Sequence, residues 1–180
     1  MSKDDLVILG IDPGSTVTGY GIIKDNHNKT SRSNSTTLID YGTIKVSSKK
    51  PLPLRLKEIY SGIMEIITQR KPDELALEKA FYGKNARSAL VMGEIRGVAL
   101  LAGAQAKILI AEYSPREIKS SVVGTGAASK MQVQYMVKNI LKLKNLPEPM
   151  DASDALAIAL CHLNKLKSKR RLKDMIKETE

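Results

Sequence analysis

Four acidic residues have the types and positions needed for shared chemistry. Asp12 ends the apolar run LVILGID, and Glu78 ends the shorter run ELALE. Asp151 and Asp154 open the apolar segment DASDALAIAL. Residues three apart lie on one face of a helix, so this segment predicts a buried helix with two carboxylates in its first turn. Two like charges on a buried face are costly unless a helix N-terminus or a metal ion joins them.

Carboxylates without Cys or His partners favour a hard cation, Mg²⁺ or Mn²⁺, over zinc. Four acids could hold two ions, and a two-ion site cleaves phosphodiesters by clamping the attacking and leaving oxygens. The formal net charge of +10 favours a polyanionic partner, usually nucleic acid. We therefore predict a nuclease with two Mg²⁺ ions per active site, for which Mn²⁺ substitutes.

Each acid also has an ordinary structural explanation. Asp151 could be a helix N-cap, with Asp154 simply in the first turn. The Asp12-Pro-Gly sequence could be only a turn, and Glu78 only a solvated strand end. The metal site is preferred because all four acids would meet at one edge of the predicted sheet, where ligands bind in open α/β sheets.

The elements that must position the acids follow from periodicity and turn residues. Five strands are predicted, at residues 6–12, 16–24, 38–46, 74–78 and 107–113. The first three would form an antiparallel meander, and the first and fourth would be parallel neighbours, which places Asp12 beside Glu78. Gly19 and Gly21 would leave little bulk over one face of the second strand. Residues 25–37 are polar and predict a loop.

Helices are predicted over residues 54–70 and 85–105, from Ser114-Pro115, from a Ser129–Gln132 capping box to about Lys144, and from Asp151. This order predicts an α/β domain with a mixed sheet flanked by helices. We expect residues 1–164 to form the domain and residues 165–180, rich in Lys and Arg, to form a charged C-terminal extension.

The 85–105 helix contains Gly93, Gly97 and Gly103. Glycine inside a helix costs about 1 kcal/mol relative to alanine, so these positions predict close approach of another element. That element would be the sheet or the same helix of a second subunit. The single cysteine, Cys161, excludes an internal disulfide. The sequence shows neither a signal peptide nor a membrane span, and we expect a cytoplasmic protein.

Several stretches resemble the RuvC family of Holliday junction resolvases. They are DPGSTVTGYG from Asp12, EKAFYGKNARSA from Glu78, VVGTGAASK from Val122 and DASDALAIA from Asp151. The resemblance runs from Leu6 to about Leu163 and implies a ribonuclease H-like fold with a mixed five-stranded sheet. It also implies that Asp12, Glu78, Asp151 and Asp154 are the catalytic, metal-binding acids.

The resemblance further implies DNA-binding residues. Phe81 matches an aromatic residue that stacks on unpaired bases, and Tyr82, Lys84 and Arg87 lie close to it in the sequence. Lys119 and Lys130 match basic residues that support DNA binding and cleavage. Lys130 follows the predicted N-cap Ser129, where a cation opposes the helix dipole, and this favours a phosphate contact. Without the resemblance, Lys119 would be read as a solvated charge.

The implied substrate is four-way junction DNA, and the implied enzyme is a homodimer. It would nick two opposing strands symmetrically, leave ligatable 5′-phosphate and 3′-hydroxyl ends, and serve recombination and DNA repair with the RuvA–RuvB branch-migration complex. A two-fold dimer suits a junction with an approximate two-fold axis, and the glycine-bearing helix is the candidate interface.

Three alternatives remain open at this point. A nuclease of the same fold could act on another substrate, such as an RNA–DNA hybrid. A sugar kinase or actin-like ATPase also has an Asp and Gly after its first strand, but needs two such domains and a longer chain. A junction-binding module without activity would not need four acids.

Overall fold

The computed structural model describes residues 5–26, 36–79 and 86–177. Three of the expected DNA-binding residues, Phe81, Tyr82 and Lys84, lie outside these ranges. The five strands are β1 (Asp5–Asp12), β2 (Val17–Asn26), β3 (Thr36–Lys45), β4 (Glu74–Glu78) and β5 (Leu109–Tyr113). The five helices are α1 (Leu52–Arg70), α2 (Ala86–Gln105), α3 (Pro115–Val123), α4 (Lys130–Ile140) and α5 (Met150–Lys177).

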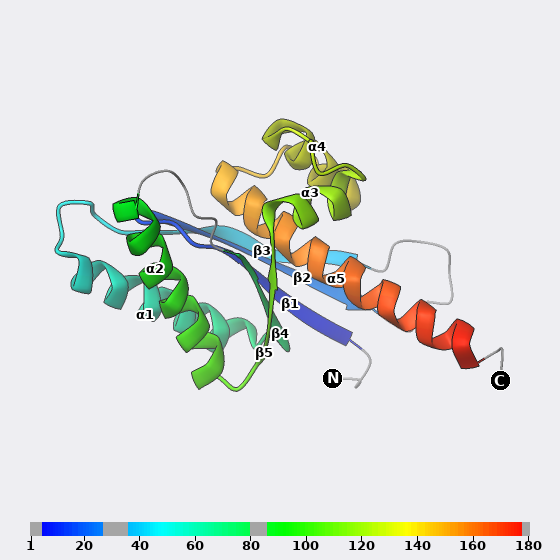
Figure 1. Cartoon of the computed structure of the whole chain (residues 1–180), viewed down its shortest axis with the longest axis horizontal. Coiled ribbons are helices and arrows are strands. Elements are labelled where there is room, and N and C mark those ends of the chain that lie inside the picture. Colours follow the sequence, from blue (N-terminus) through cyan, green and yellow to red (C-terminus); the bar gives the residue numbers. More distant parts are fainter. Residues whose placement is uncertain (1–4, 27–35, 80–85, 178–180) are drawn as a thin grey trace.

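The strands form one mixed sheet in the order β3-β2-β1-β4-β5 (Figure 1). The β1–β2 and β2–β3 pairs are antiparallel, which confirms the predicted meander. The β1–β4 and β4–β5 pairs are parallel, as expected for strands joined through crossover helices. The mixed five-stranded sheet flanked by helices is thus confirmed.

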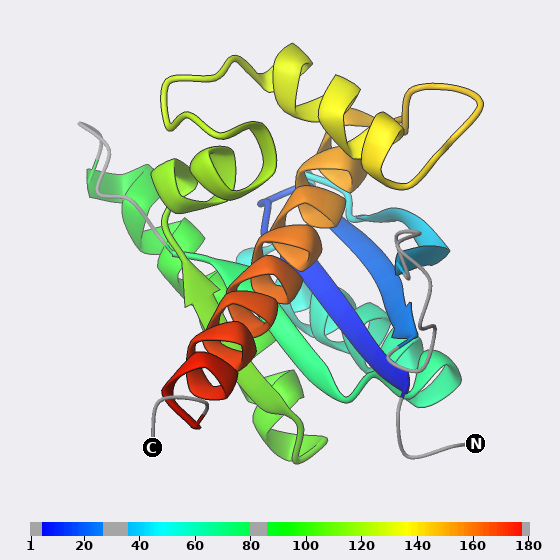
Figure 2. The ribbon, with the colours of Figure 1, turned by 90° about the vertical axis from the view of Figure 1, so that its right-hand side faces the viewer.

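Helices cover both faces of the sheet and bury alternate residues of each strand. Helices α1 and α2 lie on one face, and α3, α4 and α5 lie on the other (Figure 1, Figure 2). Leu9 packs with Ile59 of α1 and Ile95 of α2, whereas its neighbour Ile8 packs with Leu156 of α5. This period of two is the signature of a central strand buried on both sides.

The structure corrects the predicted ends of several elements. Positions 25–26 and 36–37 belong to strands and not to a loop, because Asp25 pairs with Thr36 in the hairpin ladder. Helix α4 ends at Ile140, because Lys142 adopts a left-handed backbone (φ 53°). Strand β5 begins at Leu109, after a turn in which Lys107 has φ 57°.

Two helix starts are fixed by capping boxes. In the predicted one, the Ser129 side chain accepts a hydrogen bond from the Gln132 backbone N–H, and the Gln132 side chain accepts one from the Ser129 N–H. The same reciprocal pattern joins Ser114 to Glu117 at the start of α3, where the sequence predicts a helix from Ser114-Pro115 but not this capping box. Among the described residues, no helix has the length and apolar character needed to cross a membrane.

Candidate active site

Asp12 and Glu78 lie side by side at the carboxyl edge of the sheet. The parallel register pairs Ile11 with Leu77, so these two acids are the next residues on adjacent strands. The turn after Asp12 is held from two sides. The Thr18 hydroxyl donates to the Gly14 carbonyl over 3.2 Å, and the Arg55 guanidinium donates to the Ser15 carbonyl over 2.8 Å.

Helix α5 lies directly on β1 and β2 because glycine stands beneath it. A Cβ atom added to Gly19 would lie 2.0 Å from the Asp151 carbonyl oxygen, and one added to Gly10 would lie 2.1 Å from that of Ala155. No side chain fits in this space. The expectation that the glycines of the second strand leave room over one face is confirmed, and the approach brings the start of α5 to Asp12.

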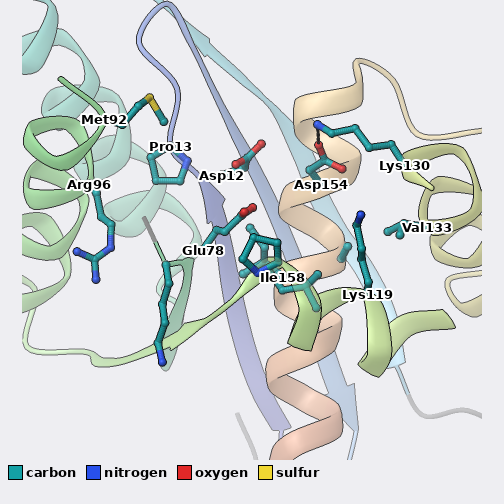
Figure 3. A pocket seen from close by; sticks show the side chains of 14 residues that line it. Asp12, Pro13, Glu78, Met92, Arg96, Lys119, Lys130, Val133, Asp154 and Ile158 are labelled. Carbon is teal, nitrogen blue, oxygen red and sulfur yellow. Dashed lines mark hydrogen bonds and ion pairs between the residues drawn. The ribbon is translucent and has the colours of Figure 1, made fainter. Parts of the chain in front are cut away.

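Three of the four predicted acids share one pocket of about 360 Å³ (Figure 3). Asp12, Glu78 and Asp154 line it, with Glu78 beside Asp12 and the Asp154 carboxylate pointing to Lys130. Asp151, one residue into α5, is half-buried but is not among the lining residues. Within the described ranges, no three His, Cys, Asp or Glu side chains are grouped closely enough to hold a metal ion as they stand.

The three acids of the pocket repel one another. Burial, followed by repulsion from Glu78 and Asp154, raises the pKa of Asp12 to about 7. Burial and the charge of Asp154 also raise the pKa of Glu78. Opposing this, the Lys130 ammonium lies 2.7 Å from an Asp154 carboxylate oxygen and lowers the pKa of both other acids. Positive charge is therefore stabilised beside these acids, and Lys130 supplies it to Asp154 directly.

The expected basic residues are placed differently from one another. Lys119 on α3 and Lys130 on α4 both line the pocket, whereas Arg87 is exposed in the first turn of α2 and does not. Two further cations were not predicted. Lys79 follows Glu78 directly, and Arg96 of α2 forms an ion pair with Glu112 of β5.

The remaining walls of the pocket are largely apolar. They include Met92, Pro115, Ile118, Val133 and Ile158. The spacing of Met92 and Arg96, four apart on one helix, shows that they share a face, but it does not show that this face meets the acids. Apolar walls strengthen charge interactions in the pocket because they limit access of water.

A buried hydrogen-bonded chain fixes α5 behind the acids. The His162 ring accepts or donates at both nitrogens, with the Tyr113 hydroxyl at 2.6 Å and a Glu74 carboxylate oxygen at 2.6 Å. His162 is 3% exposed and lies two helical turns beyond Asp154. These contacts connect α5 to β4 and β5. Because both ring nitrogens have hydrogen-bond partners, His162 has a structural role in the fold.

The strand order and the acids at the carboxyl ends of β1 and β4, with a helix laid across them, place the chain in the ribonuclease H-like class of folds. The family model described as crossover junction endodeoxyribonuclease RuvC matches residues 8–162. The chain belongs to this family.

Named relatives cover most of the chain. A crossover junction endodeoxyribonuclease RuvC of Vibrio cholerae is 51% identical over 158 residues, which are 88% of this chain and 87% of that protein. The protein of the same name from Desulforamulus reducens is 47% identical over 157 residues, 87% and 93% of the two chains. The structure of Thermus thermophilus RuvC in complex with Holliday junction substrate matches with a TM-score of 0.81 and 30% identity, covering 91% and 96% of the two chains.

Proposed function

We propose that this chain resolves Holliday junctions as a metal-dependent endonuclease, nicking two opposing strands symmetrically. The observation that carries the proposal is the convergence of Asp12, Glu78 and Asp154 in one pocket with Lys119 and Lys130. Membership of an endonuclease family and the likeness to a relative in complex with Holliday junction substrate support the choice of substrate. The products would be ligatable 5′-phosphate and 3′-hydroxyl ends.

The donor set fits two Mg²⁺ ions, with Mn²⁺ as a substitute. Asp12, Glu78, Asp154 and the neighbouring Asp151 offer only oxygen donors, which hard divalent cations prefer. Burial and repulsion from Glu78 and Asp154 raise the pKa of Asp12, and a bound cation would relieve that repulsion. When bound, two ions would supply the charge that stabilises the attacking and leaving oxygens of the phosphodiester.

The other pocket residues have roles that follow from their contacts. Lys130 holds Asp154 through a charge-assisted hydrogen bond, and would turn to the DNA phosphate when other cations neutralise the acids. Lys119, whose charge lowers the pKa of Glu78, would contact the phosphate from the α3 side. Phe81, Tyr82, Lys84 and Arg87 remain proposed contacts to the junction, with Phe81 stacking on unpaired bases.

We propose a two-fold dimer through the exposed face of α2. Among the described residues, a Cβ atom added to Gly93 or Gly97 would meet nothing within 4 Å, so the contacts described within the subunit do not explain either glycine. Leu90 and Leu101 flank them on the same face and are 69% and 56% exposed. Gly103 differs, because its Cβ would lie 2.9 Å from the Ile110 side chain of β5. Association with a RuvA–RuvB complex is proposed from family membership alone.

Cleavage of a mobile synthetic four-way junction with Mg²⁺ tests the function. Wild type should make paired symmetric nicks, whereas Asp12→Asn and Glu78→Gln should bind the junction without cutting it. Glu65→Gln, an exposed acid on α1, is the matched control and should cut normally. Binding without cleavage by wild type in Mg²⁺ and Mn²⁺ would leave a junction-binding module as the better account. Equal cleavage of linear duplex or of an RNA–DNA hybrid would retain the metal site and reject the substrate.

A further inference from the structure

Helix α3 separates the acid pocket from a second cavity. Its residues Pro115, Ile118 and Lys119 line the acid pocket, and Arg116, Ser120 and others on its opposite side line a groove of about 620 Å³. The far wall of this groove is the C-terminal half of α5, which runs alongside α3 (Figure 2). The two cavities are therefore neighbours that share one helix as a wall.

The groove is basic. Each residue that lines it carries a polar or charged side chain. Four cations, Arg116, Lys165, Lys167 and Arg171, accompany a single carboxylate, Glu117. That carboxylate accepts hydrogen bonds from the Ser114 backbone and hydroxyl, which lower its pKa, so its charge serves the helix cap.

One of the cations has a structural partner and three are exposed. Lys167 lies 2.9 Å from an Asp25 carboxylate oxygen, and this ion pair fastens α5 to β2. Arg116, Lys165 and Arg171 are exposed. On α5, positions 164, 168 and 171 share a face at helical spacing. The Asn164 amide donates to Ser121 and the Ser168 hydroxyl donates to the Asn164 carbonyl, so the exposed Arg171 guanidinium is the group that this row offers to a ligand.

We propose that this groove binds the sugar–phosphate backbone of a duplex arm that leaves the active site. The inference rests on the proposed junction function and adds a second contact site to it. Exposed guanidinium and ammonium groups with hydroxyl donors are the groups that position DNA through its phosphates. The groove offers no apolar anchor, so a hydrophobic peptide segment has nothing to fill. The shared α3 wall gives a strand held near Lys119 a direct route to Arg116.

A duplex arm that lies along α5 would place the contacted phosphates at a definite distance from the cut. Asp154 and Arg171 are seventeen positions apart on one helix, or about 25 Å along its axis. At 3.4 Å per base pair, this distance corresponds to roughly seven base pairs of duplex from the cut phosphate. The groove therefore reads backbone position and carries no sequence information.

The test compares two triple variants by the salt dependence of junction binding. The groove variant is Arg116→Gln, Lys165→Gln, Arg171→Gln. The control is Lys57→Gln, Lys71→Gln, Lys107→Gln, which removes the same charge from exposed positions outside both cavities. Each lost phosphate contact makes the slope of log K against log salt about 0.9 shallower. We expect the slope for the groove variant to be shallower than that for the control by about 2 to 3.

Neutral methylphosphonates placed about six to nine base pairs from the cut site complete a double-mutant cycle. They should weaken wild-type and control binding but leave the groove variant unchanged. Equal slopes for both variants, or equal methylphosphonate effects, would overturn the inference. A groove variant that keeps DNA affinity but loses binding to poly-glutamate would show a site for acidic peptides instead, which also overturns it. If wild type fails to bind the junction at all, the proposed function itself fails.

Discussion

Among single residues, Asp12 is the acid of the site whose ionisation is most strongly disfavoured. Its carboxyl group is buried beside Glu78 and Asp154, and its pKa of about 7 lies far above its ordinary value of 3.8. Between these two values the folded chain holds a proton that the unfolded chain has released. Stability falls with rising pH wherever the folded state binds more protons, so this group destabilises the metal-free protein as pH rises from about 4 to 7.

Asp12→Asn should remove that pH dependence. Without metal, the free energy of unfolding of the variant should exceed that of wild type by about 2.6 kcal/mol more at pH 8 than at pH 5. Denaturant unfolding in the presence of a chelator at both pH values measures the gap. Glu65→Gln, outside the acid pocket, should show no widening. A gap for Asp12→Asn that stays constant with pH would contradict the buried, repelled carboxylate.

The same carboxyl predicts how metal binding depends on pH. Because the ligand form of Asp12 is the carboxylate, apparent Mg²⁺ affinity should rise as pH increases through about 7. Lys130 lowers the pKa of Asp12 and Glu78, so Lys130→Gln should move this midpoint upward. Calorimetric titration at several pH values gives the midpoint independently of cleavage. A midpoint near the ordinary carboxyl value, in either protein, would refute the prediction.

Among the elements, the contact between α5 and the sheet decides whether the acids meet. Gly19→Ala would place a methyl group 2.0 Å from the Asp151 carbonyl, so the first turn of α5 must move. We expect loss of Mg²⁺ binding, together with a destabilisation of about 1–3 kcal/mol from overpacking. Gly62→Ala on α1, where the atoms nearest to the new methyl group belong to the Ile44 side chain at 3.0 Å, should keep the site. Metal titration and thermal unfolding of both variants measure these effects.

The placement of Asp12 beside Glu78 could be predicted, because each ends an apolar strand and the crossover implies parallel neighbours. Asp151 and Asp154 were expected to act together, yet residues three apart differ by about 60° around a helix. Which of them faces the pocket depends on how α5 packs, and Asp154 lines it while Asp151 does not. The spacing of the sequence alone cannot set that rotation.

Other misses have local causes. The sequence did not predict the end of α4, because leucines continue the apolar periodicity past Ile140. The left-handed backbone of Lys142 nevertheless interrupts the helix. The sequence did not predict that Arg96 lines the pocket, because its ion pair with Glu112 joins α2 to β5, a strand that follows α2 in the chain. Such contacts between elements appear only once the sheet order is known.

At the scale of the whole molecule, α2 presents a face whose glycines are not explained by any contact in the described part of the chain. Gly93→Ala with Gly97→Ala should favour the isolated helix by about 1 kcal/mol per site. If the two glycines allow a second subunit to approach, the pair should nevertheless weaken the dimer by at least about tenfold, since each methyl group intrudes on the interface. Sedimentation across a concentration series, with Gly62→Ala as control, decides between the two effects. A dimer as strong as wild type would remove α2 from the interface.

Helix α5 is one continuous rod from Met150 to Lys177, with Asp154 near one end and Arg171 near the other. A continuous helix sets both the distance between two residues and their relative rotation about the helix axis. Inserting four residues after Leu166 would add about 6 Å and turn the far end by only about 40°, whereas inserting two would add about 3 Å and turn it by roughly 200°. If the far end guides DNA, the shorter insertion should do more harm. The position at which the DNA is held would then depend on the rotation of the far end of the helix as well as on the length of the helix.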